Sequence, residues 1–273
     1  MATRYLIVVS EEDATARLIA EYWGTPPSTG EFVDGAPLRQ LAPEVEMLRR
    51  PGLHIVDEKL DAVLPARLKV TPIVFPSRHR GESGIACLTV HPLGNLGPIA
   101  EMGGEPGRLV PTAARLMADA LREAEEPARA IGVPATFEAT HHGPLLHQPA
   151  FFVEISSALP EADRLTVARP LADALQDLDE EPEDRVAVGV GGGHYAPHFT
   201  ELVLRRRWAF GHIVPRHALE GLTPDVMRQL RDGVPPPEGA VFQRASDAER
   251  PEWKAWGRRL RDPDAPPRPT GGE

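Results

Sequence analysis

The chain has 273 residues, a formal net charge of −10 at pH 7 and a hydrophobic content of 41%, which is ordinary for a soluble globular protein. Its single cysteine, Cys87, excludes an internal disulfide and any cysteine-cluster metal site, so a bound metal would need histidine, aspartate or glutamate ligands. No apolar run approaches the roughly 18 residues of a transmembrane helix, and the first residues are too short and strand-like for a signal peptide, so we expect a cytoplasmic protein.

Apolar periodicity and turn residues predict that strands and helices alternate along most of the chain. In the first half, the expected strands are 5–9, 53–56, 70–75 and 85–90, and the expected helices are 11–23, 59–64 and 111–125. The stretch 24–37 is rich in glycine, proline, serine and threonine, which predicts a loop.

The second half continues this alternation and then changes in composition. Strands are expected at 135–140, 150–155, 186–190 and 209–214, and helices at 167–178, 199–207 and 224–231. From residue 233 the sequence thins into proline, glycine and arginine. Trp253 and Trp256 are expected to hold this stretch against the body, and 262–273 to be disordered. We therefore expect an α/β domain over 1–232 and a Pro- and Arg-rich, partly disordered extension over 233–273.

Alternating strands and helices are typical of α/β folds. The predicted fold is a single three-layer domain, in which helices cover both faces of one mixed, mostly parallel, twisted sheet. Open α/β sheets bind ligands at the carboxyl ends of their strands. Residues that directly follow the predicted strands are therefore the first candidates for a functional site.

Three predicted strands each end in histidine followed by turn residues. The segments and their histidines are 87–95 with His91, 138–144 with His141 and His142, and 186–200 with His194 and His198. A lone histidine is most often structural, but three such clusters in one chain favour a shared site. In the last segment Gly191, Gly192 and Gly193 let the backbone come close to a bound group.

The spacing of His194 and His198 and the position of Glu154 both need a closer look. His194 and His198 are four residues apart, as in zinc-binding helices, but Pro197 prevents a helix from starting earlier and leaves His194 in the loop. Glu154 interrupts an apolar strand, and if buried it needs a cation, a metal or hydrogen bonds. The alternative is an edge-strand glutamate that points to water.

Positive charge is concentrated at residues 78–80 and 205–207. The net negative charge argues mildly against general affinity for nucleic acids, although it does not exclude a local basic face. We predict that Arg78, Arg80 and residues 205–207 border the site and contact phosphates. The alternative for either cluster is a solvated loop or helix face.

Two kinds of chemistry are open to these residues. A metal such as zinc, held by histidine and carboxylate, would lower the pKa of a bound water to about 7 and so provide a hydroxide for ester or amide cleavage. Alternatively, the glycine turn could cradle a phosphate, with His194 as acid or base. The glycines match neither dinucleotide-binding nor P-loop motifs, and no Gly-x-Ser-x-Gly elbow indicates a serine hydrolase.

Several longer stretches add to these patterns. They are Ser77-Arg78-His79-Arg80, Leu88-Thr89-Val90-His91-Pro92 with Gly94-Asn95, Thr140-His141-His142-Gly143-Pro144, Val153-Glu154-Ile155, Gly191-Gly192-Gly193-His194-Tyr195-Ala196-Pro197 and Gly211-His212-Ile213. In this order they resemble the D-aminoacyl-tRNA deacylase family of archaea and plants. The resemblance implies a zinc-dependent hydrolase that cleaves the ester between a D-amino acid and tRNA. It also implies a fold similar to nucleoside phosphorylases and peptidyl-tRNA hydrolase. Residues 91–94 and 156–157 depart slightly from the family pattern, and the stretch after Leu219 matches only weakly.

The strand-end pattern and the resemblance together define a candidate site. The candidate metal ligands are His91, His141, His142, Glu154, His194, His198 and His212, of which His194, Glu154 and His142 are also candidate catalytic residues. The candidate substrate-binding residues are Arg78, His79, Arg80, Asn95, Gly191, Gly192, Gly193, Tyr195 and Arg206. We expect the histidines to converge with Glu154 because their strands would share one edge of a parallel sheet. Since adjacent strand residues point to opposite faces, only one of His141 and His142 should face the cleft.

The expected function is hydrolysis of D-aminoacyl-tRNA by water activated by one or two zinc ions, with no DNA or membrane partner. A monomer is favoured, although the sequence leaves the oligomeric state open. Two alternatives remain: a metal-free phosphate-binding hydrolase or phosphorylase, and a tRNA-binding module with structural zinc. His217, on a predicted helix beyond Pro215, is expected to tolerate replacement by alanine and to serve as a control for His194.

Overall fold

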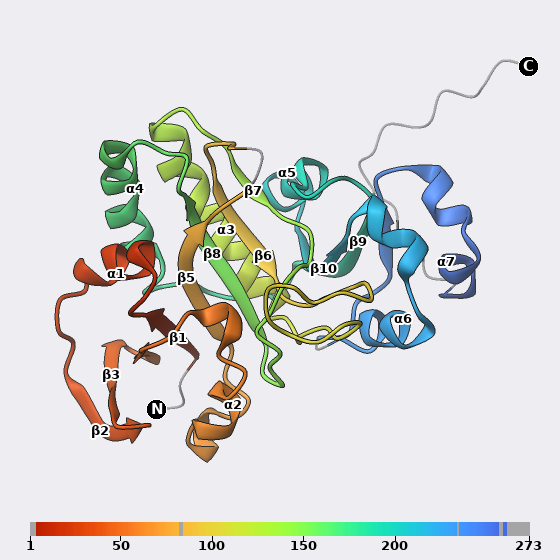
Figure 1. Cartoon of the computed structure of the whole chain (residues 1–273). Helices are drawn as coiled ribbons and strands as arrows, with labels where there is room; N and C mark the ends of the chain where they lie inside the picture. Colours follow the sequence, from red (N-terminus) through yellow and green to blue (C-terminus); the bar gives the residue numbers. More distant parts are fainter. Residues whose placement is uncertain (1–3, 82–83, 234, 257–258, 261–273) are drawn as a thin grey trace, which may run out of the picture.

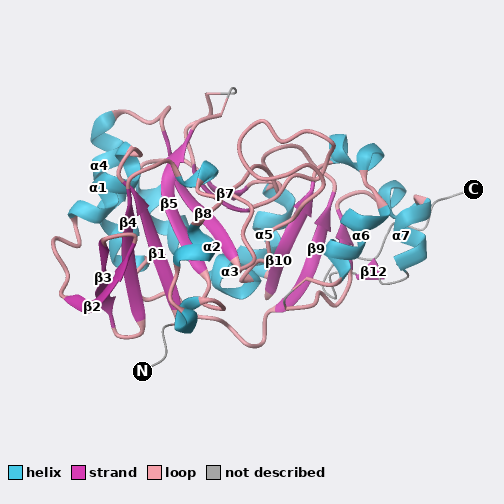
Figure 2. Cartoon of the chain, turned by 60° about the horizontal axis from the view of Figure 1, so that its bottom comes forward, coloured by secondary structure: helices cyan, strands magenta, loops and turns pink. Residues whose placement is uncertain are grey.

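A computed structural model describes residues 4–81, 84–233, 235–256 and 259–260 (Figure 1). The described strands form two sheets that lie side by side (Figure 2). The larger has eight strands in the order β2-β3-β4-β1-β5-β8-β6-β7, and the smaller has four in the order β10-β9-β11-β12. The α/β class and the mixed, mostly parallel arrangement are confirmed, but the single expected sheet is replaced by two.

The elements have the following bounds. The strands of the larger sheet are β1 (Tyr5–Ser10), β2 (Ser28–Val33), β3 (Ala36–Ala42), β4 (Val45–Arg50), β5 (Ile73–His79), β6 (Leu88–Pro92), β7 (Ala135–Phe137) and β8 (Ala150–Ser156). Those of the smaller sheet are β9 (Arg185–Val190), β10 (Trp208–Val214), β11 (Ala240–Phe242) and β12 (Arg259–Leu260). The α-helices are α1 (Ala14–Glu21), α2 (Leu60–Val63), α3 (Ala114–Ala130), α4 (Glu161–Ala174), α5 (Pro197–Arg205), α6 (Pro224–Arg231) and α7 (Pro251–Trp256). The 3₁₀-helices are η1 (His54–Val56), η2 (Ala66–Leu68), η3 (Arg216–Gly221) and η4 (Ala245–Glu249).

Helices cover both faces of the sheets, as predicted. One hydrophobic core runs beneath α1, α3, α4 and α5 and includes residues of both sheets, so the two sheets share this layer. The opposite face of the larger sheet packs against α2 and η2. The opposite face of the smaller sheet packs against η3, α6 and α7. The result is a three-layer molecule with one continuous core layer, even though its sheet is divided.

The expectations for residues 24–56 are wrong in two places. The predicted loop instead contains β2 and leads into β3 and β4, and the predicted strand 53–56 is the 3₁₀-helix η1. The hairpin of β2 and β3 is largely exposed or half-buried, so its sequence lacks an apolar alternation. In β4 the nearly buried Arg50 is possible because its guanidinium binds Asp57 at 2.7 Å and Asp34 at 2.9 Å.

The segment after β7 joins the two sheets. The Thr140 N–H donates to the carbonyl oxygen of Ile213 in β10 at 2.9 Å, and the Ala139 N–H donates to that of His194 at 2.7 Å. On its other side, His141 bridges to Leu93 just after β6. The strand expected over 135–140 therefore stops at Phe137, and the following residues run between the sheets.

Part of the expected extension packs on the smaller sheet. The strand β11 pairs with β9 in parallel, and the buried Trp253 contacts the rings of Phe242 and Trp256. Residues 262–273, which we expect to be disordered, lie outside the described residues. The division at residue 232 remains a prediction.

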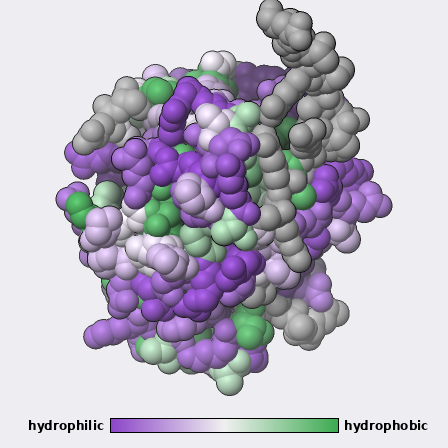
Figure 3. All heavy atoms as spheres, turned by 90° about the vertical axis from the view of Figure 1, so that its right-hand side faces the viewer, coloured by the Kyte–Doolittle hydropathy of each residue, from purple (hydrophilic) through white to green (hydrophobic). Residues whose placement is uncertain are grey.

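The side of the molecule that carries the smaller sheet faces the viewer in Figure 3. Its visible surface is mainly hydrophilic, with small separate hydrophobic patches. Within the described residues, no helix combines the length and the apolar character needed to cross a bilayer.

Candidate metal and catalytic site

Three neighbouring strands place polar side chains on one face of the larger sheet. In the register of β5, β8 and β6, Glu154 lies beside Ser77 on one side and beside Thr89 on the other. His79 and His91 are each two residues further along their strands, and side chains two apart share a face. Because β6 is antiparallel to β8, these residues meet across the face of the sheet. We expected the histidines and Glu154 to converge because their strands would end at one edge of a parallel sheet, and this expectation about the strands is wrong.

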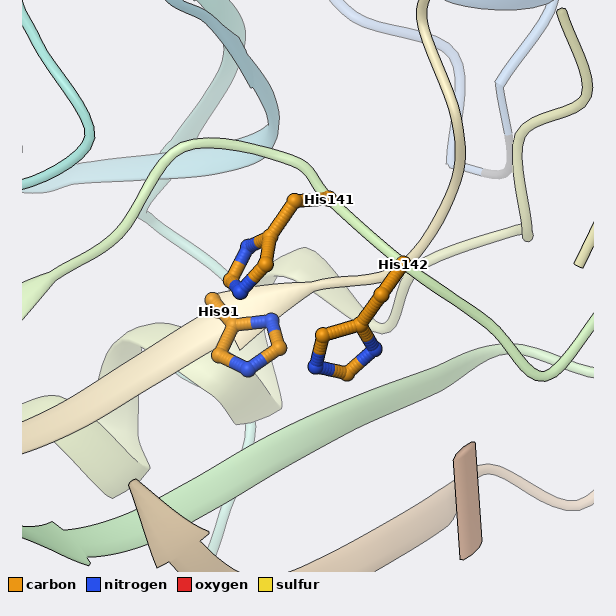
Figure 4. A group of neighbouring side chains, drawn as sticks. All are labelled: His91, His141 and His142. Carbon is orange, nitrogen blue, oxygen red and sulfur yellow. The ribbon is translucent and has the colours of Figure 1, made fainter. Parts of the chain in front are cut away.

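His91, His141 and His142 form a triangle of imidazoles (Figure 4). Their ring centroids are 4.2 Å apart for His91 and His141, 4.9 Å for His91 and His142, and 4.5 Å for His141 and His142. Both adjacent histidines face this group, contrary to the expected alternation. The strand has already ended at Phe137, and His142 has a φ of +45°, so the rule for strand side chains does not apply.

The Nδ1 atom of each of these rings lies near a backbone carbonyl oxygen. The distances are 3.3 Å from His91 to Pro92, 2.7 Å from His141 to Ala139 and 2.7 Å from His142 to Gly143. A proton on Nδ1 satisfies these contacts and leaves the lone pair on Nε2. A backbone contact of this kind orients the histidine ligands of metal sites.

Glu138 links this triangle to the polar face of the sheet. Its side chain is fully buried, and its oxygens lie 3.1 Å from His79 Nδ1, 3.6 Å from His194 Nε2 and 3.7 Å from His141 Nε2. None of these contacts has hydrogen-bond geometry, so both oxygens lack a hydrogen-bond partner among the described residues. The sequence reasoning did not select Glu138. The feature that singled out Glu154, a carboxylate among apolar residues of a predicted strand, also applies to Glu138 and could have identified it.

Glu154 is buried and not at an exposed sheet edge. Its Oε2 lies 3.3 Å from His79 Nδ1, accepts a hydrogen bond from the Thr89 hydroxyl at 3.4 Å and lies 3.7 Å from His91 Nε2. The other nitrogen of His79, Nε2, is 2.9 Å from the Tyr195 hydroxyl. His79 thus connects both carboxylates to the loop that follows β9.

The pKa values of the two carboxyl groups are shifted in opposite directions. Burial raises the pKa of Glu138 to about 9, and the charge of Glu154 adds to this. Burial also acts to raise the pKa of Glu154, but the hydrogen bond to His79 and the nearby His91 hold it well below its usual range. Desolvation lowers the pKa of His142 and of His194 to about 4 and that of His141 well below its usual value. These three imidazoles are therefore neutral at pH 7, as metal ligands must be.

Three overlapping groups of side chains could hold a metal ion. They are His91, His141 and His142; Glu138, His141 and His194; and His79, Glu138 and Glu154. His91 Nε2 and both oxygens of Glu138 are buried polar atoms with no hydrogen-bond partner in the described chain. A cation would satisfy these atoms, and a donor set of imidazole and carboxylate without sulfur suits zinc.

Two of the predicted metal ligands lie outside these groups. His212 Nδ1 is 3.2 Å from the Thr140 hydroxyl, so this buried histidine connects β10 to the segment between the sheets. His198 lies in the first turn of α5, where its ring contacts Phe199. Pro197 is the first residue of that helix, the earliest start that the sequence allows, so α5 begins and ends two residues before the expected 199–207.

The predicted substrate-binding residues are divided between the site and more distant places. Arg78 and Arg80 are exposed on either side of His79. Asn95 instead supports a loop, since its side-chain amide donates to the carbonyl oxygen of Gly103 at 3.0 Å. Arg206 directly follows the last residue of α5, roughly 13 Å of helix away from the site.

The glycine loop lies next to the metal-binding groups, and so does His217, the residue expected to serve as a control. Gly191 and Gly192 have φ angles of +114° and +83°, which favour glycine. The Gly192 carbonyl oxygen accepts a hydrogen bond from the Arg216 N–H, which fixes η3 and its residue His217 against this loop. His217 is therefore a poor choice for a distant control.

A family model and curated relatives of this chain carry the same description. A family model described as D-aminoacyl-tRNA deacylase matches residues 66–258. Curated proteins named D-aminoacyl-tRNA deacylase include one from Haloarcula marismortui, 35% identical over 235 residues, and one from Thermoplasma acidophilum, 34% identical over 172 residues. These alignments cover 79% and 63% of this chain and 50% and 67% of the relatives, so the chain spans about half the length of the Haloarcula protein.

A solved structure matches over nearly the whole chain. A crystal structure described as a conserved protein of unknown function has a TM-score of 0.76 and 27% sequence identity. The match covers 94% of this chain and 91% of that one. Both sheets therefore recur together in an experimentally determined fold.

Proposed function

Because this chain belongs to the D-aminoacyl-tRNA deacylase family, we propose that it hydrolyses the ester bond between a D-amino acid and tRNA, releasing both. The observation that carries the proposal is the cluster around Glu138. Three imidazole nitrogens and two carboxyl groups converge there, and some of their buried atoms lack partners. Such a site has the ligands and the proton-transferring groups that ester hydrolysis by an activated water requires.

Zinc is the cofactor that we propose for this site. His91, His141 and His142 would hold one ion, and the groups that share Glu138 would hold a second if two are bound. When bound, zinc supplies a water of lowered pKa and positive charge for the developing oxyanion.

The protein side chains would divide the remaining tasks. His194 is 43% exposed, which makes it the cluster histidine that a substrate ester can reach. Burial raises the pKa of Glu138 to about 9, and a cation bound beside it would lower that pKa and ionise the carboxyl. Glu138 lies within 3.7 Å of three imidazoles and would then be placed to accept and return the proton of the attacking water. Glu154 would hold His79, and through it Tyr195, in position.

A metal-free phosphate-binding hydrolase is less well supported, because it would leave His91 Nε2 and the Glu138 oxygens buried without partners. A tRNA-binding module with structural zinc would retain the ligands without turnover. A single assay distinguishes the three alternatives.

The test is to incubate the purified protein with D- and L-aminoacyl-tRNA before and after removal of bound metal by a chelator, with zinc content measured in parallel. We expect hydrolysis of the D-ester, loss of at least about 10³-fold in rate on chelation, and recovery on addition of zinc. Full activity after complete metal removal would favour the metal-free alternative. Bound zinc without hydrolysis would favour the tRNA-binding module.

A further inference from the structure

Arg216 and His217 are exposed side chains at the start of η3. Within the described part of the chain, no ion pair joins either side chain to a carboxylate. By contrast, two arginines of the basic run 205–207 are bound to acids, Arg205 to Glu125 at 2.6 Å and Arg207 to Glu183 at 3.3 Å. In a chain of net charge −10, an exposed arginine without an acidic partner is a candidate for binding an external anion.

The position of these side chains follows from the ends of β9 and β10. The Gly191 N–H donates to the carbonyl oxygen of Val214 at 2.9 Å, and the Arg216 N–H donates to that of Gly192 at 2.9 Å. These bonds hold the glycine loop and the start of η3 together at the carboxyl ends of two parallel strands. His194 leaves the same loop and reaches Glu138 at 3.6 Å. The backbone of Arg216 therefore lies against the loop that carries His194 into the cluster.

The backbone of the glycine loop adds further donors. Gly193 and His194 are exposed, and their N–H groups find no acceptor among the residues that the structure describes. Arg216, His217 and two open N–H groups thus lie in the two segments that meet beside His194, whereas the carboxyl groups of Glu138 and Glu154 are buried.

We propose that Arg216, His217 and the N–H groups of Gly193 and His194 form a phosphate subsite for the 3′-terminal nucleotide of tRNA. This inference rests on the proposed deacylase function. In an aminoacyl-tRNA, one ribose separates the ester from the 5′-phosphate of that nucleotide, so an ester at His194 brings this phosphate to the border of the cluster. A guanidinium and backbone N–H groups are donors suited to phosphate oxygens.

The direct test is to measure the binding of AMP and of adenosine to the zinc-loaded protein and to its Arg216→Ala variant, at low and moderate salt. We expect the wild type to prefer AMP by roughly tenfold to a hundredfold, and the variant to lose most of that preference and its salt dependence. Arg216→Lys should retain part of the preference. Arg169→Ala changes an exposed arginine on α4 and is the matched control, which should leave the preference unchanged.

A second measurement separates this proposal from the proposed function. The same proteins are assayed for hydrolysis of D-aminoacyl esters of adenosine and of AMP. We expect Arg216→Ala to raise the KM of the AMP ester at least about tenfold more than that of the adenosine ester. If the wild type and Arg216→Ala show the same preference for AMP, the subsite is wrong, even if both esters are cleaved. If neither ester is cleaved but the AMP preference depends on Arg216, the subsite stands and the deacylase function fails.

Discussion

Two carboxyl groups flank one imidazole at the centre of the site. Glu138 and Glu154 lie 3.1 and 3.3 Å from His79 Nδ1, and their pKa values move in opposite directions because only Glu154 has hydrogen-bonded partners. Pairs of titratable groups whose pKa values are pushed apart commonly divide acid and base roles. At the scale of single residues, Glu138 is therefore the side chain whose replacement should be most informative.

Glu138→Gln should lower the kcat for D-aminoacyl-tRNA by at least about 10²-fold, because an amide of the same shape can neither take up the water proton nor provide a carboxylate ligand. The measurement is steady-state kinetics together with zinc content. His147→Ala is the control, since the His147 side chain is 88% exposed and bonds only the nearby Asp61 in the described structure. Near-normal kcat with unchanged zinc would exclude a central role for Glu138.

At the scale of elements, the loop segments around residues 55, 103 and 143 are packed backbone to backbone beside His142. The Gly143 N–H donates to the carbonyl oxygen of Met102 at 3.0 Å, and Asn95 holds Gly103. Gly103 has a φ of +73°, and a Cβ there would lie 1.7 Å from the carbonyl oxygen of Ile55. The orientation of His142 therefore depends on a segment remote from it in sequence.

Gly103→Ala should destabilise the protein and weaken zinc binding, because the added methyl group would push the loop away from Ile55 and disturb Gly143. Gly132→Ala provides a matched control, since Gly132 has a φ of +74° but no atom within 4 Å of the added Cβ. Both changes should cost about 1–2 kcal/mol for the positive φ, and the clash adds a further cost only at Gly103. Urea unfolding and zinc titration measure the difference. Equal effects of the two changes would contradict this account of the loop.

At the scale of the whole molecule, buried neutral histidines connect stability to pH. His54 is buried against Phe75 and Phe152, and its Nε2 accepts the Ser10 N–H at 3.0 Å. Burial lowers the pKa of His54 to about 4, whereas in the unfolded chain it is near 6.5. Between these values the unfolded state binds more protons, so stability falls as the pH drops through this range.

We expect His54 to account for about 3 kcal/mol of the stability lost between pH 6.5 and 4 in metal-free protein. The His54→Gln variant retains an acceptor near Ser10 but does not titrate, so its free energy of unfolding should fall less over the same range. Urea unfolding at several pH values measures both slopes. Parallel pH profiles for the two proteins would show that His54 does not contribute.

The local patterns of the sequence were sufficient for several elements and for most of the site. The apolar run of β1, the helix that begins at Pro197 and the bounds of α6 follow from burial, proline geometry and helical periodicity, which act within a few residues. The histidines 91, 141, 142 and 194 were selected because they end predicted strands, and Glu154 was selected because a carboxylate inside an apolar strand needs a partner. The same rule, applied to Glu138, would have added the carboxylate that two of the three possible metal-binding groups share.

Pairing between segments distant in sequence decided the sheet arrangement and which side chains meet. Whether β6 runs parallel or antiparallel to β8, and whether the strands form one sheet or two, depends on backbone hydrogen bonds that local sequence does not encode. The same pairing places His212 against Thr140 outside the metal groups, carries Arg206 away from the site and brings the backbone of Arg216 against the loop that carries His194. Side-chain type therefore determined which chemistry this chain can perform, whereas the tertiary structure determined which of those side chains meet.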